Sequence, residues 1–366
     1  MSSSQHRRRR QLSGQTGLNL KTRGTVVRIL LSPANMSAVA EVGRRSTDVT
    51  MGEKTSRAKV SVALVGVGPT WELHYRDAIQ RLSSKLTVKA ICDSVQMRAA
   101  VVADEFEAMP ISCPWHLTQR TDLHAWLILD PGWFDTYPAA LAVKHGRPAL
   151  FANTFCAPIS KLLPLLNEAM ECGEPLMPEF PQRFTPATTR LRELIATKFG
   201  PVHKIEVTVP LAEVTAADVH EWLTENQPGA IGLFDWCACL VGTPCTAVSF
   251  QTTSAGSQLR LSFAAQASHP NDPPTATIHF APDAIDCRQV ECERGSASLG
   301  GKTQISWQAG EECGQEVHGN ERSPYEIILD QFCRRALGGL VPVPTVTDAI
   351  QAITTMQMAL ASVVSP

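Results

Sequence analysis

Hydrophobic positions follow one pattern before Gly200 and another after it. In the first part, short apolar runs bounded by turn residues alternate with longer segments of helical spacing. These predict strands at 60–65, 125–129 and 148–152, and helices at 94–107, 134–144 and 159–171. Such alternation is typical of parallel strands joined by crossover helices.

Beyond Gly200, polar and apolar residues alternate as they do in half-buried strands. The segments with this pattern are 203–211, 246–254, 258–266, 275–281, 285–293 and 303–308. Successive extended segments separated by turns indicate an antiparallel or mixed sheet. Helices are predicted to close the chain at 325–337 and 345–362.

The segment 59–93 reads as strand, glycine-rich turn, helix, second strand and terminal acid. Gly66 and Gly68 are small enough for backbone N–H groups to approach a pyrophosphate at the N-terminus of the next helix. Asp93 ends the second strand and is placed to accept hydrogen bonds from a ribose diol. Trp71 replaces the third glycine of the G-x-G-x-x-G pattern, which weakens the ligand signal more than the fold signal.

The two patterns together predict an α/β N-terminal dinucleotide-binding (Rossmann) domain at 58–178. They also predict a C-terminal α+β domain at 179–366, built on an open, mainly antiparallel sheet. Residues 1–57 have no sustained hydrophobic period and carry consecutive arginines at 7–10, so we expect a disordered tail. Met51 resembles a natural start, and residues 1–50 are expected to be dispensable or to reflect a mis-set start codon.

Composition narrows the possible partners. A formal net charge of -2 and a pI near 6.6 give no general attraction for nucleic acid or anionic membranes. The 11 cysteines show no CxxC pair and no zinc-finger spacing, so we expect reduced thiols, no metal site and a cytoplasmic protein. The apolar stretch 26–31 is too short to span a membrane. We therefore expect small molecules or protein surfaces as partners.

From Lys59 to Ser362 the chain resembles the glucose-fructose oxidoreductase and inositol dehydrogenase (Gfo/Idh/MocA) family. The segments that carry the resemblance are AICDSVQMRAAVVADEF at 90–106, LILDPGWFDTYPAALAVKHGRPALF at 127–151, PQRFTPATTRLRELIATKFGPVHKIEV at 181–207, VGTPCTAV at 241–248 and SPYEIILDQFCRRAL at 323–337. Their order and spacing, rather than any one of them, favour the fold of that family.

The resemblance implies a nicotinamide cofactor laid across the strand ends, with hydride transfer to or from a sugar or polyol. Asp93 favours NAD because an acid at that position repels a 2'-phosphate, while Ser94 and Arg98 keep NADP possible. The cofactor-binding residues expected are Gly66, Gly68, Pro69, Trp71, Asp93, Ser94, Arg98 and Pro131.

The family's proton-carrying positions are replaced in this chain. Its Glu-Lys-Pro falls on 152–154, which puts the uncharged amide of Asn153 in the place of the lysine. Its D-x-G-x-H-x-x-D helix falls on 228–235, so Gly232 stands where the histidine would be and only Asp235 is kept. The remaining catalytic candidates are Asp235, Arg183 and Asn153.

Other side chains near the predicted domain junction are alternatives for acid or base chemistry, namely Glu179, Gln182, His220 and Glu221. Each candidate also has a structural interpretation. For Arg183 an ion pair at the junction is favoured over substrate contact, and for Asp235 a buried hydrogen-bonding role stands beside a role in the site. Trp71 either fills a gap in the packing or forms an aromatic wall that narrows the cofactor cleft.

Two functions are open at this point. The first is a divergent NAD(P)-dependent oxidoreductase acting on a sugar-like or other small polar substrate. The second is a non-catalytic nucleotide- or ligand-binding protein, a sensor or scaffold. The resemblance also implies a homo-oligomer formed through the C-terminal sheet.

Overall fold

The computed structural model describes residues 18–22, 25–29, 59–212, 214–253, 256–266, 272–282, 285, 287–319 and 322–364. The chain divides into two compact units, Met1–Arg57 and Ala58–Pro366. In the first unit, β1 (Leu18–Thr22) and β2 (Thr25–Ile29) form an antiparallel pair. The rest of the predicted N-terminal tail lies outside the described residues. No helix among the described residues is long and apolar enough to cross a bilayer.

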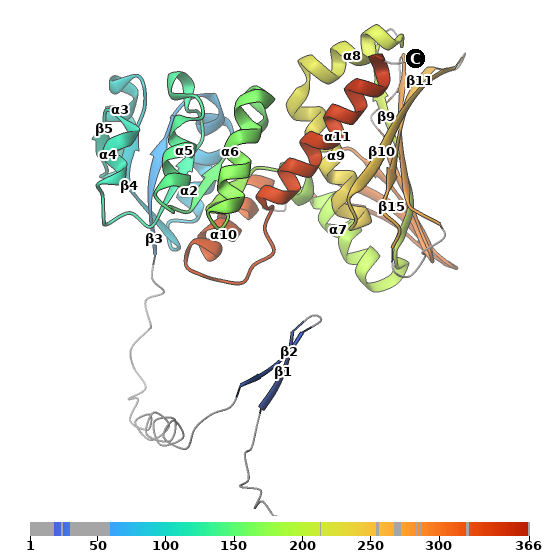
Figure 1. The fold of residues 1–366 in the computed structure, drawn as a ribbon, viewed down its shortest axis with the longest axis horizontal. Coiled ribbons are helices and arrows are strands. Elements are labelled where there is room, and N and C mark those ends of the chain that lie inside the picture. Colours follow the sequence, from blue (N-terminus) through green and yellow to red (C-terminus); the bar gives the residue numbers. More distant parts are fainter. Residues whose placement is uncertain are drawn as a thin grey trace, which may run out of the picture. The chain divides into compact units, whose positions relative to one another are not determined.

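A parallel sheet forms the N-terminal part of the second unit (Figure 1). Its strand order is β5-β4-β3-β6-β7-β8. The bounds are β3 (Val60–Val65), β4 (Leu86–Cys92), β5 (Met109–Ile111), β6 (Ala125–Ile128), β7 (Ala149–Phe151) and β8 (Leu176–Pro178). Nearly every side chain of β3 and all those of β6 are buried, as expected for strands covered on both faces. This confirms the Rossmann-like architecture.

Helical segments connect these strands. They are η2 (Trp71–Tyr75), α2 (Arg76–Arg81), α3 (Gln96–Phe106), α4 (Pro114–Thr118), η3 (Gly132–Phe134), α5 (Tyr137–Lys144), η4 (Thr154–Cys156) and α6 (Ile159–Glu171). A further 3-10 turn, η5 (Pro181–Phe184), follows the last of these strands, β8. The helix predicted from 134 begins later, at Tyr137. Asp135 has φ +50°, a left-handed conformation that a helix interior does not accept, so only a short 3-10 turn precedes it.

The C-terminal part of the unit contains a second sheet of eight strands, with the order β10-β11-β12-β9-β13-β14-β15-β16. The bounds are β9 (Val202–Pro210), β10 (Cys245–Thr253), β11 (Gly256–Phe263), β12 (Thr275–Ala281), β13 (Cys287–Cys292), β14 (Gly295–Gly300), β15 (Gln304–Ala309) and β16 (Glu312–Val317). Only the β12 and β9 pair is parallel, which confirms a mainly antiparallel sheet. Strands β14 and β16 were not predicted, because their sequences GSASLG and ECGQEV lack a clear apolar alternation.

Helices cover one face of this second sheet (Figure 1). They are α7 (Pro186–Leu194), η6 (Ile195–Phe199), α8 (Ala216–Glu225), α9 (Gln227–Val241) and α11 (Val346–Val364). On β12, Ala276, Ile278 and Phe280 are buried, while the alternate residues are partly exposed. A row of outward positions crosses the sheet in register and is entirely polar: Ser249, Arg260, Thr277, Glu206, Gln289, Ser298, Ser306 and Gln315.

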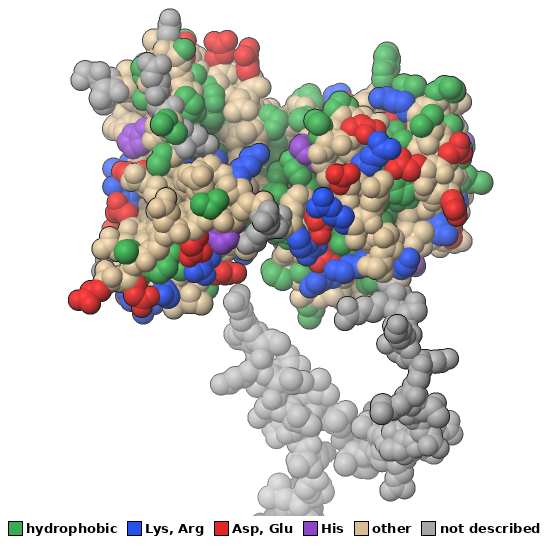
Figure 2. Space-filling model, turned by 180° about the vertical axis from the view of Figure 1, so that it is seen from behind, with side chains coloured by type: hydrophobic (Ala, Val, Ile, Leu, Met, Phe, Trp, Pro, Cys, Tyr) green, Lys and Arg blue, Asp and Glu red, His purple; other side chains and the backbone are tan. Residues whose placement is uncertain are grey.

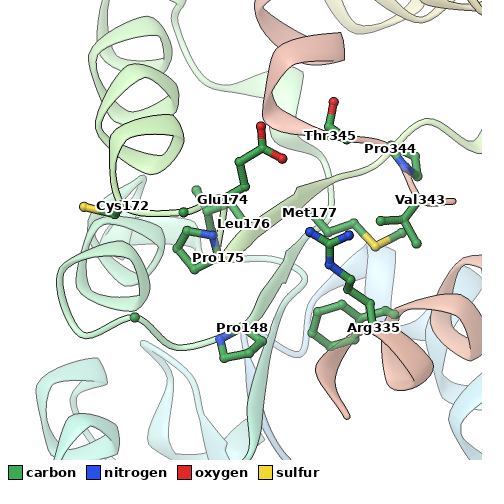
Figure 3. Close-up of a pocket in the computed structure, with 13 residues that line it drawn as sticks. Pro148, Cys172, Glu174, Pro175, Leu176, Met177, Arg335, Val343, Pro344 and Thr345 are labelled. Atoms are coloured by element: carbon green, nitrogen blue, oxygen red, sulfur yellow. The ribbon is translucent and has the colours of Figure 1, made fainter. Parts of the chain in front are cut away.

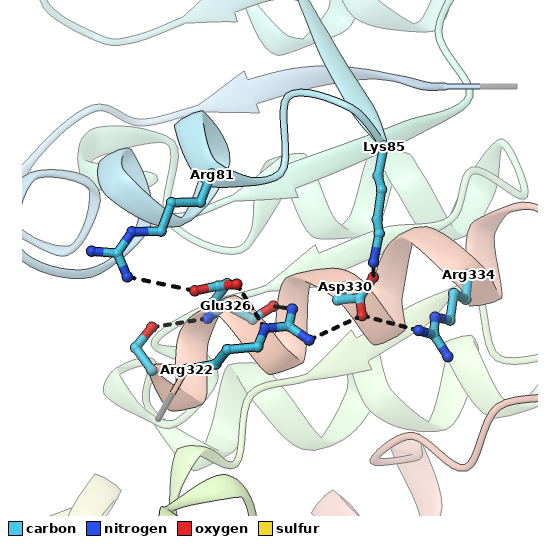
Figure 4. Close-up of polar contacts among 7 residues, drawn as sticks. Arg81, Lys85, Arg322, Glu326, Asp330 and Arg334 are labelled. Carbon is cyan, nitrogen blue, oxygen red and sulfur yellow. Dashed lines mark hydrogen bonds and ion pairs between the residues drawn. The ribbon is translucent and has the colours of Figure 1, made fainter. Parts of the chain in front are cut away.

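Helix α10 (Pro324–Ala336) follows the second sheet in sequence but packs on the first, parallel sheet. Its Ile328 and Phe332 share a buried cluster with Val60 and Val62 of β3. Ion pairs reinforce this packing (Figure 4): Asp330 contacts Lys85 at 2.5 Å and also the guanidinium groups of Arg322 and Arg334, and Glu326 contacts Arg81 and Arg322. The late helix therefore returns to the first, parallel sheet.

Candidate functional site

The glycine-rich turn after β3 packs against Asp130, which follows β6. A Cβ at Gly66, where φ is +83°, would lie 1.8 Å from the backbone oxygen of Asp130, so only glycine fits. A Cβ at Gly68 would lie 3.1 Å from the Asp130 Cβ and 3.4 Å from its Oδ2. The side chain of Asp130 therefore lies directly over the second glycine of the turn.

Asp130 also caps the helical segment that begins at Pro69 and runs through η2 and α2 to Arg81. Its Oδ2 accepts a hydrogen bond from the Trp71 N–H at 3.0 Å. The first N–H groups of a helix have no partner within the helix and carry partial positive charge, so they attract an anion. In this chain that anion is a carboxylate of the protein itself.

Asp93 lies where the sequence predicted, at the end of β4, and is 2% exposed. Its Oδ2 accepts from the Val67 N–H at 2.9 Å, and its Oδ1 accepts from the Val95 N–H at 2.7 Å. The Arg98 Nη2 is 3.1 Å from the same Oδ1. Both oxygens thus bind the protein, one of them the glycine-rich turn.

The other predicted cofactor residues surround this turn. Ser94 is exposed, and its Oγ would lie 3.6 Å from a Cβ at Gly132. The end of β4 and the turn after Pro131 therefore lie close to each other. Pro69, which has no N–H, removes one donor from the turn. Trp133, on the turn after Pro131, is 94% exposed.

Trp71 is fully buried and faces the core. Its ring meets Phe106 of α3 edge to face at 5.6 Å between centroids. Its Nε1 has no hydrogen-bond partner. The helix widens to a π-helix from Trp71 to Tyr75, which provides room for an indole where a glycine would allow close packing. Of the two interpretations of Trp71, packing is the one that this geometry favours.

Asn153 lies at the end of β7 with φ +49°. Its side-chain amide donates to the Thr70 hydroxyl, which ties β7 to the glycine-rich turn. Its backbone N–H donates to Glu179 Oε2 at 2.9 Å. The Asn153 amide is thus held by the protein's own contacts at the start of the helix.

Glu179 is a buried carboxylate beside this contact. The hydroxyl of Tyr75 donates to its Oε1 at 2.5 Å. Burial raises the pKa of Glu179, and the charge of Asp130 adds to this, while the bonds from Tyr75 and Asn153 oppose it. Burial, with the nearby Glu179, also raises the pKa of Tyr75 well above its usual value. Glu179 and Tyr75 therefore form a buried, hydrogen-bonded acidic pair close to the turn.

Gly232 lies on a buried part of α9, and Gln182 occupies the space beside it. A Cβ at Gly232 would lie 3.1 Å from the Gln182 Nε2. The Oε1 of Gln182 accepts from the Arg288 Nη1 at 3.0 Å, so the amide is fixed in place. A neutral amide, held by Arg288, therefore fills the space beside Gly232.

Arg183 and Asp235 form a closed ion pair at the junction. Arg183 Nε and Nη2 donate to the two oxygens of Asp235 at 2.7 and 2.5 Å. Arg183 Nη1 also lies 3.3 Å from Asp348 on α11. Burial raises the pKa of Asp235 to about 6, against the opposing effect of Arg183. This geometry corresponds to the structural interpretation of both residues.

His220 and Glu221 lie on α8. Glu221 borders a groove with Asp218 and Glu225, and no residue of the glycine-rich turn lines that groove. Within the described part of the chain, no group of three or more His, Cys, Asp or Glu residues is arranged to hold a metal ion. Asp130, Thr70 and Tyr75 were not predicted as site residues. Only Asp130 had a signal in the sequence, because it is an acid at a strand end directly before Pro131.

A separate cavity of about 230 Å³ lies at the amino-terminal ends of β7 and β8, at the opposite end of the strands from the glycine-rich turn (Figure 3). Pro148 and Pro175, which directly precede β7 and β8, line it together with Arg335 of α10. In open α/β sheets ligands bind outside the carboxyl ends of the strands. The cavity is at the amino ends, so the glycine-rich turn is the better candidate.

Figure 2 shows acidic and basic side chains interspersed over the displayed face of the described residues.

Comparison with solved structures supports the architecture. A putative NADPH-dependent oxidoreductase from Desulfitobacterium hafniense aligns with a TM-score of 0.66 at 14% identity, over 84% of this chain and 96% of its own. UDP-N-acetylglucosamine 3-dehydrogenase from Acidithiobacillus ferrooxidans aligns with a TM-score of 0.62 at 16% identity, over 84% and 98%.

A putative myo-inositol dehydrogenase from Sinorhizobium meliloti gives the same values, a TM-score of 0.62 at 16% identity over 84% and 98%. No family model and no curated protein matches the chain. The chain has the fold of Gfo/Idh/MocA-type dehydrogenases.

The glycine-rich turn, with the hydrogen bonds that it makes in this structure, does not fit a bound diphosphate. The N–H of Trp71 is taken by Asp130, that of Val67 is taken by Asp93, and Pro69 has none. A diphosphate at this turn would lie against the Asp130 carboxylate.

Proposed function

We propose that this chain is a non-catalytic member of the dehydrogenase fold, a ligand-binding or scaffold protein that does not transfer hydride. The observation that carries the proposal is that neutral amides engaged in the protein's own contacts lie at Asn153 and beside Gly232, the positions that the resemblance aligns with the family's proton carriers. Asn153 donates to Thr70, and Gln182 occupies the space beside Gly232.

Oxidation of an alcohol by hydride transfer requires a group that accepts the hydroxyl proton. Neither a carboxamide nor a glycine has a side-chain pKa near neutral pH, whereas histidine does. The nearby Arg183 and Asp235 offer no replacement, because both oxygens of Asp235 accept from Arg183 and the third guanidinium nitrogen of Arg183 faces Asp348.

A divergent NAD(P)-dependent oxidoreductase, acting on a sugar-like or other small polar substrate, is the second candidate. The observation that favours it is the Tyr75 and Glu179 pair, since a carboxyl group with a raised pKa is suited to acid or base work. Both oxygens of Glu179 already accept hydrogen bonds, which favours a structural role. NAD, with NADP as the alternative, is the cofactor proposed for this candidate because Asp93 ends β4.

We also propose that the chain forms a homo-oligomer through the second sheet. Helices cover one face of that sheet, and its outward row of residues is polar. An interface built on such a face would be hydrogen-bonded and wet rather than apolar. Sedimentation equilibrium measures the association directly, and Thr277→Lys should weaken it because a charge would be placed in the middle of the face.

The experiment that tests the main proposal is a turnover assay of the purified full chain. NAD+ or NADP+ is supplied with a panel of sugars and polyols, and NADH or NADPH is supplied with the matching ketoses and aldoses. We expect no change in absorbance at the nicotinamide band above that of enzyme-free samples. Turnover that Glu179→Gln abolishes would replace the main proposal with the second candidate.

A further inference from the structure

We propose that Asp130 is an internal anion that competes with phosphate-bearing ligands for the N-terminus of the helix 69–81. The inference concerns binding and does not depend on whether hydride transfer occurs. Its basis is the position of one carboxylate relative to the glycine-rich turn.

Two contacts define that position. The Oδ2 of Asp130 accepts from the Trp71 N–H at 3.0 Å, as a phosphate oxygen does at the first turn of a helix. The Asp130 side chain also lies within 3.1 to 3.4 Å of the point where a Cβ would project from Gly68. That glycine is the one whose missing side chain lets a pyrophosphate approach the backbone.

The surrounding groups preserve this arrangement. Asn153 donates to Thr70 and so holds the start of the helix against β7. Gly66 contacts the Asp130 backbone too closely for any side chain between them. The carboxylate therefore lies just after β6 and faces a turn that packs closely against it.

A diphosphate that reached the turn would meet a like charge and lose a donor. Like charges a few ångströms apart repel strongly in a partly buried site. The nearby Glu179 carboxyl is a second acidic group, and the charge of Asp130 contributes to the raised pKa of Glu179. Weak binding of dinucleotides then follows from Asp130 itself, apart from any loss of catalytic residues.

The test compares the wild-type chain with Asp130→Asn and Asp130→Thr. Asparagine keeps an oxygen that can accept from the Trp71 N–H and removes only the charge, whereas threonine also shortens the side chain. The probes are inorganic pyrophosphate and NADH, measured by isothermal titration calorimetry. Circular dichroism spectra and melting curves confirm that the variants are folded.

Asp122→Asn is the matched control. Asp122 precedes β6 and pairs with Arg120, whereas Asp130 follows the same strand, so both changes remove one charge from opposite ends of one element. The chain's net charge changes equally in the two variants.

We expect both Asp130 variants to bind pyrophosphate and NADH on the order of tenfold or more tightly than the wild type. Equal affinity in all proteins, no measurable binding in any of them, or an equal gain in Asp122→Asn would overturn the inference. Tight binding by the wild type without turnover would overturn the inference and leave the non-catalytic proposal standing.

Discussion

Arg183 donates two hydrogen bonds to Asp235, and the pair links η5 to the middle of α9. The side chain of Asp235 is 2% exposed and that of Arg183 is 12% exposed. A buried charge that loses its partner costs far more than an exposed one, because water does not replace the lost contact. The pair therefore explains the stability of the junction better than it explains any chemistry.

Replacing Arg183 with methionine should lower the free energy of unfolding by about 3–5 kcal/mol, because Asp235 is left buried and unpaired. The double variant Arg183→Met, Asp235→Leu should recover much of this loss. Urea denaturation measures both. Arg120→Met is the control: its partner Asp122 is 51% exposed, so a cost of about 0–1 kcal/mol is expected. Equal costs for the two arginines would contradict the structural role.

The architecture could be predicted because hydrophobic period and turn chemistry report it directly. The run Val60–Val65 followed by Gly66 and Gly68 is sufficient to place a buried strand and a tight turn. Strands without an apolar alternation, such as β14 and β16, could not be predicted from the sequence, because the burial of their side chains depends on neighbouring strands in the sheet.

The site was less predictable because it depends on side-chain direction. Asp130 is distant in sequence from Trp71, and nothing local in the sequence says that one caps the other. Gln182 beside Gly232 is a similar case, since the filled space exists only after η5 and α9 pack together. The residue at position 153 or 232 can be read from a sequence, but the group that packs beside it cannot.

Replacing Trp71 with glycine should destabilise the protein, although it would restore the family's glycine pattern. The indole is fully buried against Phe106, so its removal leaves a cavity and should cost about 3–5 kcal/mol. Trp71→Phe should cost much less, because it keeps most of the ring volume and removes an indole N–H that has no partner. Thermal and urea unfolding of the two variants give the ranking, and a more stable glycine variant would refute the packing role.

Asp330 should matter more than any one of the cations around it. Its side chain is 5% exposed and contacts Lys85, Arg322 and Arg334. Asp330→Asn is expected to lower the free energy of unfolding by about 2–4 kcal/mol, because three cations lose one anion. Arg334→Met should cost about 1 kcal/mol or less, since two cations remain and Arg334 is 59% exposed. Hydrogen exchange of α10 would show whether the loss is local, and equal effects of the two changes would argue against a shared anion.

Glu316 should make the second sheet sensitive to acid. Hydrogen bonds from Arg190 are the main cause that lowers its pKa to about 2, with help from the Trp307 indole N–H. Because the folded state holds this carboxylate ionised more strongly than the unfolded state does, the stabilisation is complete above about pH 4.5. It is lost as the pH falls toward 2.

Glu316→Gln should therefore cost about 1–2 kcal/mol at pH 7, after allowance for partial exposure, and progressively less as the pH falls below 4.5. Urea denaturation between pH 3 and 7 measures the difference from the wild type. Glu312→Gln on the same strand is the control, because Glu312 is 68% exposed and pairs only with Lys198 among the described residues. A cost that stays constant with pH would show that Glu316 acts through packing and not through its charge.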